Sequence, residues 1–311
     1  MKRLKYFLLM TMLFSGTLIA EKPMKYVETG VDPDAWVMIP AGEFYFGQHQ
    51  HEKNIDYDYE IMITDVTNQQ YADYLNAALD SGTVYIKNDT IWGHHPGDPF
   101  DAYLHEWEIP AGDYPHVPVS NPGLRLDYKN GIFTSKTGYG NHPMVEVSWF
   151  GAKAYADFYG YRLPTEMEWE KAARGSGTSD YPWGNTVERN QANFVSSHNL
   201  FKKMFGDVVK TTPVGFYNGK TYDGYETIEG ITPYGLYDMA GNVYQWTGDD
   251  HPKVHYRYMR GGSYQSYEYS LRVWPRNSAG PEHTSMSLGF RCARDPVVEV
   301  ETEATDAEVT E

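Results

Sequence analysis

The clearest periodic pattern in the chain begins at Thr67 and predicts a helix over residues 68–79. The Thr67 hydroxyl can accept a hydrogen bond from the backbone of the first helical turn, and Gln70, three residues later, can return a bond to the capping residue. Four apolar residues then recur at the spacing of one helical face. These are Tyr71, Tyr74, Leu75 and Ala78.

A second capping signal lies at Thr165 and Glu168, which have the same spacing. Residues suited to a helix interior follow, and Gly175 is a typical stop signal. A further helix is expected over residues 149–159, just before this one. The middle of the chain therefore contributes two short helices.

Alternation of apolar and polar residues predicts strands in three places. Residues 36–47 contain two strand fragments around a Pro-Ala-Gly turn, with Phe44 and Phe46 on one face. Residues 83–86 and 131–134 each suggest one arm of a hairpin. The rest of residues 81–140 has an irregular pattern, and an irregular stretch of this length is usually functional or disordered.

Both ends of the chain differ from the middle. Residues 1–20 have the layout of a secretory signal peptide, with three basic residues before an apolar run and Ala20 at the expected cleavage site. The apolar run is too short to span a bilayer, so no integral membrane segment is expected after cleavage. Residues 21–33 are predicted to be a linker, residues 34–295 one domain, and residues 296–311 an acidic, disordered tail.

Composition narrows the class of protein. The formal net charge of −16 argues against a nucleic acid or an anionic membrane as partner. Export predicts a secreted or periplasmic location, yet the single cysteine rules out an internal disulfide. With 15% aromatic residues, the chain suits a compact fold in which rings fill the space between irregular segments.

Five separated motifs carry a resemblance to a known family. They are residues 141–149, 162–175, 234–246, 261–264 and 289–292. In this order they resemble the formylglycine-generating enzymes, also called sulfatase-modifying factors. The resemblance implies an α+β fold of the formylglycine-generating-enzyme type, which is C-type-lectin-like and has much irregular structure. Residues 81–140 are the least family-like part and are interpreted as a divergent insertion.

The resemblance also locates the family's copper site, where two cysteines hold a monovalent ion. Ser266 and Leu271 stand at those two positions. A hydroxyl and an aliphatic side chain do not replace a pair of soft thiolates, so we expect neither copper nor oxidation of a substrate cysteine. Cys292 matches a structural cysteine whose usual partner position is occupied by Ala156, and it is expected to be a buried, inert thiol.

Calcium is the second metal that the resemblance implies. The first family site would use a side-chain oxygen at Asp238, the carbonyls of Gly241 and Val243, and the residue at Gln245, where relatives have an acid. A second site would use Asn193 and the carbonyl of Phe194, with Asp207 as the nearest acid. One carboxylate among oxygen ligands still suits calcium. A tight turn without metal is the alternative for the first site.

The former substrate groove could bind a polypeptide or a glycan. Aromatic rings and a guanidinium favour such ligands, and the same rings could instead pack in the core. A serine nucleophile is not indicated, because no Gly-x-Ser-x-Gly elbow is present. The groove candidates are Ser263, Tyr264, Tyr267, Tyr269, Trp274 and Arg276.

Two other functions remain open from the sequence. An oxidoreductase with a different metal centre, such as non-haem iron, would need histidine and carboxylate ligands. Candidates lie in the divergent insertion, although their spacing suggests surface histidines instead. They are His94, His95, Asp98, Asp101, His105 and Glu106. A structural component of a cell-envelope assembly is the third alternative.

Overall fold

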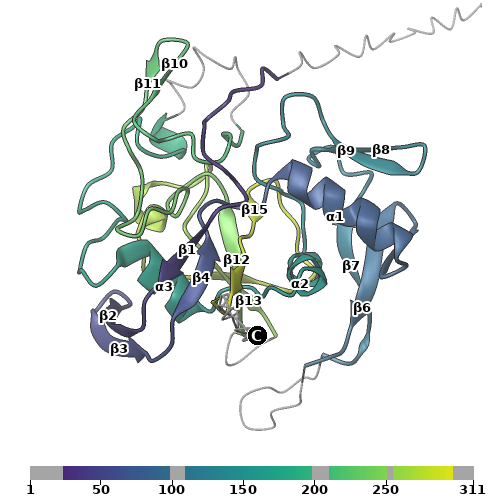
Figure 1. Ribbon diagram of the computed structural model, residues 1–311, viewed down its shortest axis with the longest axis horizontal. Coiled ribbons are helices and arrows are strands. Elements are labelled where there is room, and N and C mark those ends of the chain that lie inside the picture. The colour runs from purple at the N-terminus through teal and green to yellow at the C-terminus, as the bar shows by residue number, and fades with distance from the viewer. Residues whose placement is uncertain (1–23, 99–108, 198–209, 251–254, 297–311) are drawn as a thin grey trace, which may run out of the picture.

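The computed structural model describes residues 24–98, 109–197, 210–250 and 255–296, which form a mixed α+β fold with many short strands (Figure 1). Its α-helices in these ranges are α1 (Asn68–Asp80), α2 (Trp149–Phe158) and α3 (Glu166–Arg174). Two short 3₁₀ helices, η1 (Val195–Ser197) and η2 (Glu268–Leu271), lie in irregular stretches. The α+β class that the sequence predicted is confirmed.

Both capping predictions are correct. In α1 the Thr67 hydroxyl accepts from the Gln70 amide and the Gln70 side chain accepts from the Thr67 amide. Thr165 and Glu168 make the same reciprocal pair at α3, which ends at Gly175 with φ +70°. These bonds span three residues, so the local sequence determines where the helices begin.

A four-stranded sheet lies at the centre of the molecule. Its order is β14 (Asn277–Ala279), β13 (Arg257–Arg260), β12 (Tyr244–Asp250) and β15 (Leu288–Gly289). The β12–β15 pair is parallel and the others are antiparallel. Figure 1 shows β12 and β13 between α3 on one side and α2 on the other.

A three-stranded sheet joins the beginning and the end of the domain. Its order is β1 (Trp36–Ile39), β4 (Tyr59–Met62) and β16 (Ala293–Arg294). The two strands predicted in residues 36–47 are present, but they enter different sheets. β1 pairs with β4, and β2 (Gly42–Phe46) pairs with β3 (His51–Ile55).

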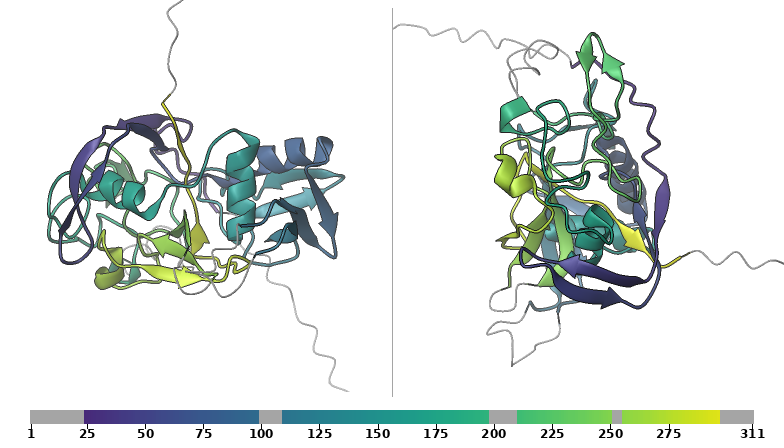
Figure 2. Two further views of the ribbon diagram at one scale, coloured as in Figure 1. Left: turned by 90° about the horizontal axis from the view of Figure 1, so that it is seen from below. Right: turned by 90° about the vertical axis from the view of Figure 1, so that its left-hand side faces the viewer.

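The region predicted to be a largely irregular insertion is more ordered than its pattern suggests. Strands β5 (Val84–Lys87), β6 (Thr90–His95) and β7 (Gly112–Pro118) form one sheet, and β8 (Leu126–Lys129) pairs with β9 (Ile132–Ser135). Their buried side chains belong to the same core cluster as those of α1 and α2. Figure 2 shows these strands at one end of the molecule and β2–β3 at the other. The sequence pattern did not predict β7 for two reasons. A long connection separates β7 from its partner β6, and residues 113 and 115 of β7 are Asp and Pro.

The predicted linker is attached to the domain where it is described. The Asn141 amide donates to the Val27 carbonyl at 2.7 Å, and Asn218 and Lys220 donate to the Thr29 carbonyl at 3.1 and 2.8 Å. Residues 24–35 therefore form an extended strap across the surface. The predicted signal peptide, the start of the linker and all but the first residue of the predicted tail lie outside the described residues.

Cys292 is fully buried in the larger core cluster, which also contains Ala156. Burial raises the pKa of its thiol, so the reactive thiolate is disfavoured. The prediction that Cys292 is buried is confirmed, and its inertness stays a prediction. A last pair of strands, β10 (Thr221–Tyr222) and β11 (Tyr225–Glu226), lies over a small aromatic cluster. Among the described helices, none is both long and apolar enough to cross a membrane.

Candidate functional site

Residues 261–271 form a folded-back segment that begins at the end of β13. Gly261 and Gly262 have φ values of +89° and +71°, a conformation that side-chain-bearing residues rarely adopt. A Cβ on Gly262 would lie 2.7 Å from the Ser270 carbonyl oxygen. The two glycines therefore allow the start of the segment to approach its end, which places both former copper positions in one compact unit.

The two serines of this segment bond to each other and to its backbone. The Ser266 hydroxyl accepts from the Ser263 amide at 3.0 Å and lies 3.3 Å from the Ser263 hydroxyl. The Ser266 hydroxyl also donates to the Tyr244 hydroxyl at 3.4 Å. Both serines are buried, with 1% and 9% of their surface exposed. They close a turn, as hydroxyls commonly do, and within the described ranges neither has a hydrogen bond to a base that would make it a nucleophile.

Leu271, at the second former copper position, is fully buried. It packs in a small apolar cluster with Tyr181, Ala192, Phe194 and Ala240. A copper ion needs donor atoms in its coordination shell, and this cluster offers an aliphatic side chain at that point. The residues present at positions 266 and 271 do not fit the copper site that the family implies.

An exposed aromatic surface adjoins the buried serines. Tyr267 and Tyr269 are 67% and 55% exposed. The Tyr269 and Trp274 rings lie 5.2 Å apart, and the Arg272 guanidinium lies 5.2 and 5.7 Å from their centres. Asp180 fixes this group by accepting from Trp274 and pairing with Arg272 at 3.2 Å each. We call Tyr267, Tyr269, Arg272 and Trp274 the aromatic surface.

The predicted groove residues are only partly brought together. Tyr264 is 4% exposed, so its ring belongs to the interior. Arg276 pairs with Glu166 at 3.0 Å and lies over the Phe46 and Tyr258 rings. Arg272 was not among the candidates. Its position four residues before Arg276 gave no signal, because only the fold shows which arginine contacts the tyrosines.

Gln245, a predicted calcium ligand, already makes hydrogen bonds within the protein through both polar atoms of its side chain. Its side-chain oxygen accepts from Trp169 at 2.7 Å and from Arg291 at 2.8 Å, and its amide donates to the Asp238 carbonyl at 2.7 Å. A guanidinium beside this oxygen opposes a nearby cation. The Gln245 oxygen therefore does not fit a calcium ligand in this arrangement.

Asp238 lies in a turn with φ +58° and accepts from the Gly215 amide at 2.7 Å. Burial raises the pKa of its carboxyl to about 6, although this hydrogen bond and Arg291 act in the opposite direction. Gly241 donates to the Gly261 carbonyl, and Val243 is fully buried. The contact from Gly215 matches the predicted turn in which Asp238 bonds to the backbone.

Asn193 offers a better oxygen for calcium. Its side-chain oxygen is buried and has no hydrogen-bond partner among the described residues, whereas its side-chain nitrogen donates to the Lys210 carbonyl at 3.0 Å. An unsatisfied buried acceptor costs roughly 1–3 kcal/mol, which a cation could offset. The Phe194 carbonyl, its expected partner, accepts from the Ser197 amide and hydroxyl. Asp207 lies outside the described residues.

The histidines of the insertion do not form a metal centre where they are described. His94 lies 3.4 Å from Asp113, and His95 lies 3.3 Å from Asp98. No group of three or more histidines, cysteines or carboxylates able to hold a metal occurs in the described part of the chain. Asp101, His105 and Glu106 lie outside that part, so the iron alternative stays a prediction.

Comparison with known proteins places the chain in a family. The sequence profile of the sulfatase-modifying factor enzyme 1-like domain matches residues 22–296. A formylglycine-generating enzyme of Thermomonospora curvata is 32% identical over 271 residues, which cover 75% of this chain and 80% of that protein. An inactive C-alpha-formylglycine-generating enzyme 2 of Bos taurus is 37% identical over 162 residues, 49% of this chain and 50% of that protein.

A longer relative and a solved structure complete the comparison. The serine/threonine-protein kinase pkn1 of Chlamydia caviae is 31% identical over 284 residues, which are 83% of this chain and 37% of that protein. The chain thus spans less than two fifths of that relative. The structure of PvdO from Pseudomonas aeruginosa has a TM-score of 0.53 at 21% identity and covers 89% of this chain and 100% of that one. This likeness and the family match confirm the predicted fold of the formylglycine-generating-enzyme type.

Proposed function

The chain belongs to the sulfatase-modifying factor enzyme 1-like family, and we propose that it is an exported member that does not oxidise cysteine with copper. Its function would be to bind a polypeptide or a glycan through the aromatic surface at the former substrate groove. The name of the inactive bovine relative is compatible with this reading.

The observation that carries the proposal is the burial of Leu271. Its side chain is 0% exposed and fills an apolar cluster, so this position supplies packing where a copper enzyme needs sulfur. Ser266 is held by Ser263 and Tyr244. Both former ligand positions thus have structural partners within the chain.

The aromatic surface supports the binding part of the proposal. Exposed tyrosines lose little conformational entropy on binding and provide large contact areas with a polar end. Tyr267 directly precedes the short helix η2 and Tyr269 lies within it. Arg272 adds donors suited to carboxylates and carbonyls. Peptides and glycans both bind to surfaces of this chemistry.

Mass spectrometry tests the absence of oxidation. The purified protein is incubated with a monovalent copper salt, oxygen and a cysteine peptide of the sulfatase type, beside the Thermomonospora curvata enzyme as positive control. We expect the peptide mass to stay unchanged with this chain. Conversion of the cysteine to an aldehyde would refute the proposal.

Binding is tested separately with peptide and glycan arrays. Tyr267→Ala and Tyr269→Ala should reduce capture of any ligand by about fivefold or more, because each removes a stacking platform. Tyr128→Ala is the matched control, since Tyr128 is an exposed tyrosine on β8. Equal capture by all three variants would exclude the aromatic surface, and the array that responds identifies the ligand class.

We also propose calcium as a structural ligand near Asn193. Calcium in excess over a chelator should raise the melting temperature, because an ion that binds only the folded state stabilises it. Asn193→Leu should abolish that increase, and Asn190→Leu, at a more exposed site nearby, should retain it. An unchanged melting temperature of the native protein would remove calcium from the proposal.

A further inference from the structure

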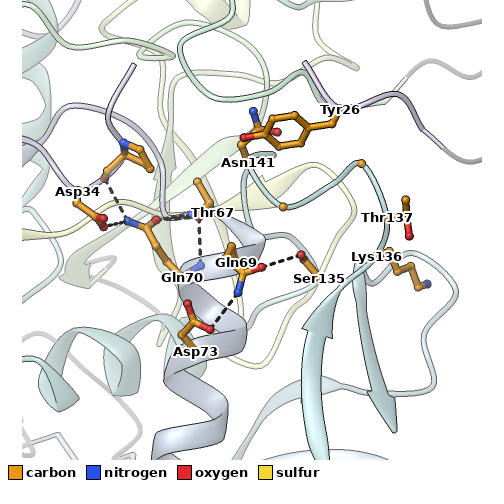
Figure 3. Close-up of a pocket in the computed structure, with 13 residues that line it drawn as sticks. Tyr26, Asp34, Thr67, Gln69, Gln70, Asp73, Ser135, Lys136, Thr137 and Asn141 are labelled. Carbon is orange, nitrogen blue, oxygen red and sulfur yellow. Dashed lines mark hydrogen bonds between the residues drawn. The ribbon is translucent and has the colours of Figure 1, made fainter. Parts of the chain in front are cut away.

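Two neighbouring cavities lie along the strap of residues 24–35, apart from the aromatic surface. One of about 450 Å³ lies between the strap, the start of α1 and the β9 region (Figure 3). The other, of about 360 Å³, lies between β1, α1 and the end of α2. They share Asp34, Gln70 and Asp73. A ligand could therefore occupy one cavity and extend into the other.

The second cavity combines aromatic walls with negative charge. We call it the aromatic pocket, and it is lined by Asp34, Trp36, Met62, Gln70, Asp73, Tyr155, Tyr159 and Tyr161. Two of these side chains are carboxylates and none is a lysine, arginine or histidine. Among the described ion pairs, none involves either aspartate. The pocket thus carries a negative charge that its own lining does not compensate.

Hydrogen bonds hold both aspartates in place. Gln70 donates to the Asp34 carboxylate at 2.6 Å, and Gln69 donates to the Asp73 carboxylate at 3.0 Å (Figure 3). Gln70 is itself fixed, because its other amide atom accepts from Thr67 at the start of α1. The Asp34 carboxylate is therefore positioned by the same capping box that begins the helix, and the Asp73 carboxylate by the neighbouring Gln69.

The aromatic residues of the walls contact one another, in one tilted and one stacked pair. The Trp36 and Tyr161 rings lie 4.8 Å apart, and the Tyr161 and Tyr159 rings lie 5.8 Å apart in a stacked arrangement. The Arg294 guanidinium already lies 4.2 Å from the Trp36 ring centre. Glu60 pairs with Arg294 at 2.6 Å, so this arginine does not neutralise the pocket. This contact within the chain places one organic cation against the Trp36 ring.

The negative charge of the two aspartates affects the pKa of Tyr159. Burial is the main cause that raises the pKa of the Tyr159 hydroxyl, and Asp73 and Asp34 raise it further. Both aspartates are exposed, so this effect indicates that their carboxylates lie near the phenol. The charges of both aspartates are therefore felt inside the pocket.

We propose that the aromatic pocket binds a protonated alkylamine, such as the side chain of lysine or a free amine. The ring faces would contact the methylene groups and the cation, and Asp34 and Asp73 would pair with the ammonium group. An anion would be repelled by both carboxylates, and a neutral sugar would gain nothing from them. The remainder of a longer ligand would enter the neighbouring cavity. This site is independent of the function proposed above.

A titration followed by NMR tests the proposal on the whole protein. The probes are Nα-acetyl-lysine N-methylamide, its neutral Nε-acetyl derivative and n-butylammonium, and the reporter is the Trp36 indole signal, assigned with Trp36→Phe. We expect the lysine derivative to bind with a Kd of about 1–10 mM, since exposed cation–aromatic and ionic contacts are individually weak. The neutral derivative should bind at least about threefold more weakly.

Substitutions test whether the Asp34 and Asp73 carboxylates bind the ammonium group. Asp73→Asn should weaken lysine binding by about threefold to tenfold, as should Asp34→Asn. Asp80→Asn is the matched control, because it removes an exposed aspartate from the same helix but outside the pocket. Tyr267→Ala should leave this binding unchanged, which separates it from the function proposed above.

Each outcome of these experiments either supports or overturns the proposal. Tighter binding of the lysine derivative than of butylammonium supports a lysine-bearing ligand that uses both cavities, and equal binding supports free amines. No response up to about 100 mM amine, which corresponds to negligible affinity, overturns the proposal. Equal binding of the charged and neutral derivatives, or an equal effect of Asp80→Asn and Asp73→Asn, overturns it as well.

Discussion

The segment 261–271 and the aromatic pocket differ in how far their side chains are already engaged within the protein. In the first, Ser263 and Ser266 bond to each other and Leu271 is fully buried. In the second, tyrosines and two aspartates line a cavity of about 360 Å³ with no cation among the lining residues. Binding requires groups whose capacity for contacts is not already used by the protein. At the position of the family's copper site, the side chains are already packed or hydrogen-bonded within the protein. The aromatic pocket, which no family motif indicated, still has groups that could contact a ligand.

The largest expected effect concerns Leu271. Leu271→Ala should lower the free energy of unfolding by about 3 kcal/mol, because it leaves a cavity in a packed cluster. Chemical denaturation measures this change. Tyr267→Ala, four residues earlier and 67% exposed, should change stability by less than about 0.5 kcal/mol. Similar losses for the two variants would contradict the assignment of Leu271 to packing.

The next effect depends on pH and concerns Asp238. Its carboxyl has a folded-state pKa of about 6 against a usual 3.8, so the folded protein favours the protonated form. Its stabilising effect is complete below pH 4 and is lost as the pH rises through 6, by roughly 2–3 kcal/mol. Asp238→Asn should remove this slope.

The measurement is the difference in free energy of unfolding between the native protein and Asp238→Asn at several pH values, in the presence of a chelator. Taking the difference cancels the titration of other groups, such as His116, whose pKa burial lowers to about 4. Asp80→Asn serves as an exposed control. A constant difference from pH 4 to pH 7 would show that folding does not raise the pKa of the Asp238 carboxyl.

A smaller effect is expected for the serine pair. Ser266→Ala leaves the buried Ser263 amide without its acceptor at 3.0 Å, which should lower stability by about 1–2 kcal/mol. A double-mutant cycle with Ser263→Ala should show a coupling of about 0.5 kcal/mol or more, since the hydroxyls are in contact. Additive losses would mean that the two hydroxyls do not act as a unit.

The smallest effect is expected in the aromatic pocket. Asp34→Asn and Asp73→Asn should leave stability unchanged or raise it by up to about 0.5 kcal/mol, because exposed substitutions are nearly neutral and a binding site often reduces stability slightly. Thermal unfolding of both variants checks this expectation. A large loss of stability would indicate that these aspartates are structural, and it would weaken the contrast between the two regions.

Much of the local structure could be predicted because its causes lie within a few residues. The capping boxes at Thr67 and Thr165 involve partners three residues away, and the two-residue period of Phe44 and Phe46 marks β2. Strand β7 was missed because its partner β6 lies across a long connection. Pairing between distant segments leaves no periodic signal in either segment alone.

The candidate site was predictable in outline and not in detail. Family motifs located Ser266, Leu271 and Gln245 by position alone. The engagement of Gln245 could not be predicted, since Arg291 is 46 residues away in sequence and the Asp65 that pairs with Arg291 is 226 residues from it. The exposure of Tyr269 and the burial of Tyr264 likewise follow from how residues 261–271 fold back.

The sequence by itself determined the absence of sulfur at positions 266 and 271, the starts of α1 and α3, and the family. These depend on residue identity and on contacts between near neighbours. Only the tertiary structure decided that the strap brings Asp34 beside Asp73 and that Trp36 and Tyr159 line one cavity. Cavities and charge clusters depend on which distant side chains meet, and that is a property of the packed chain as a whole.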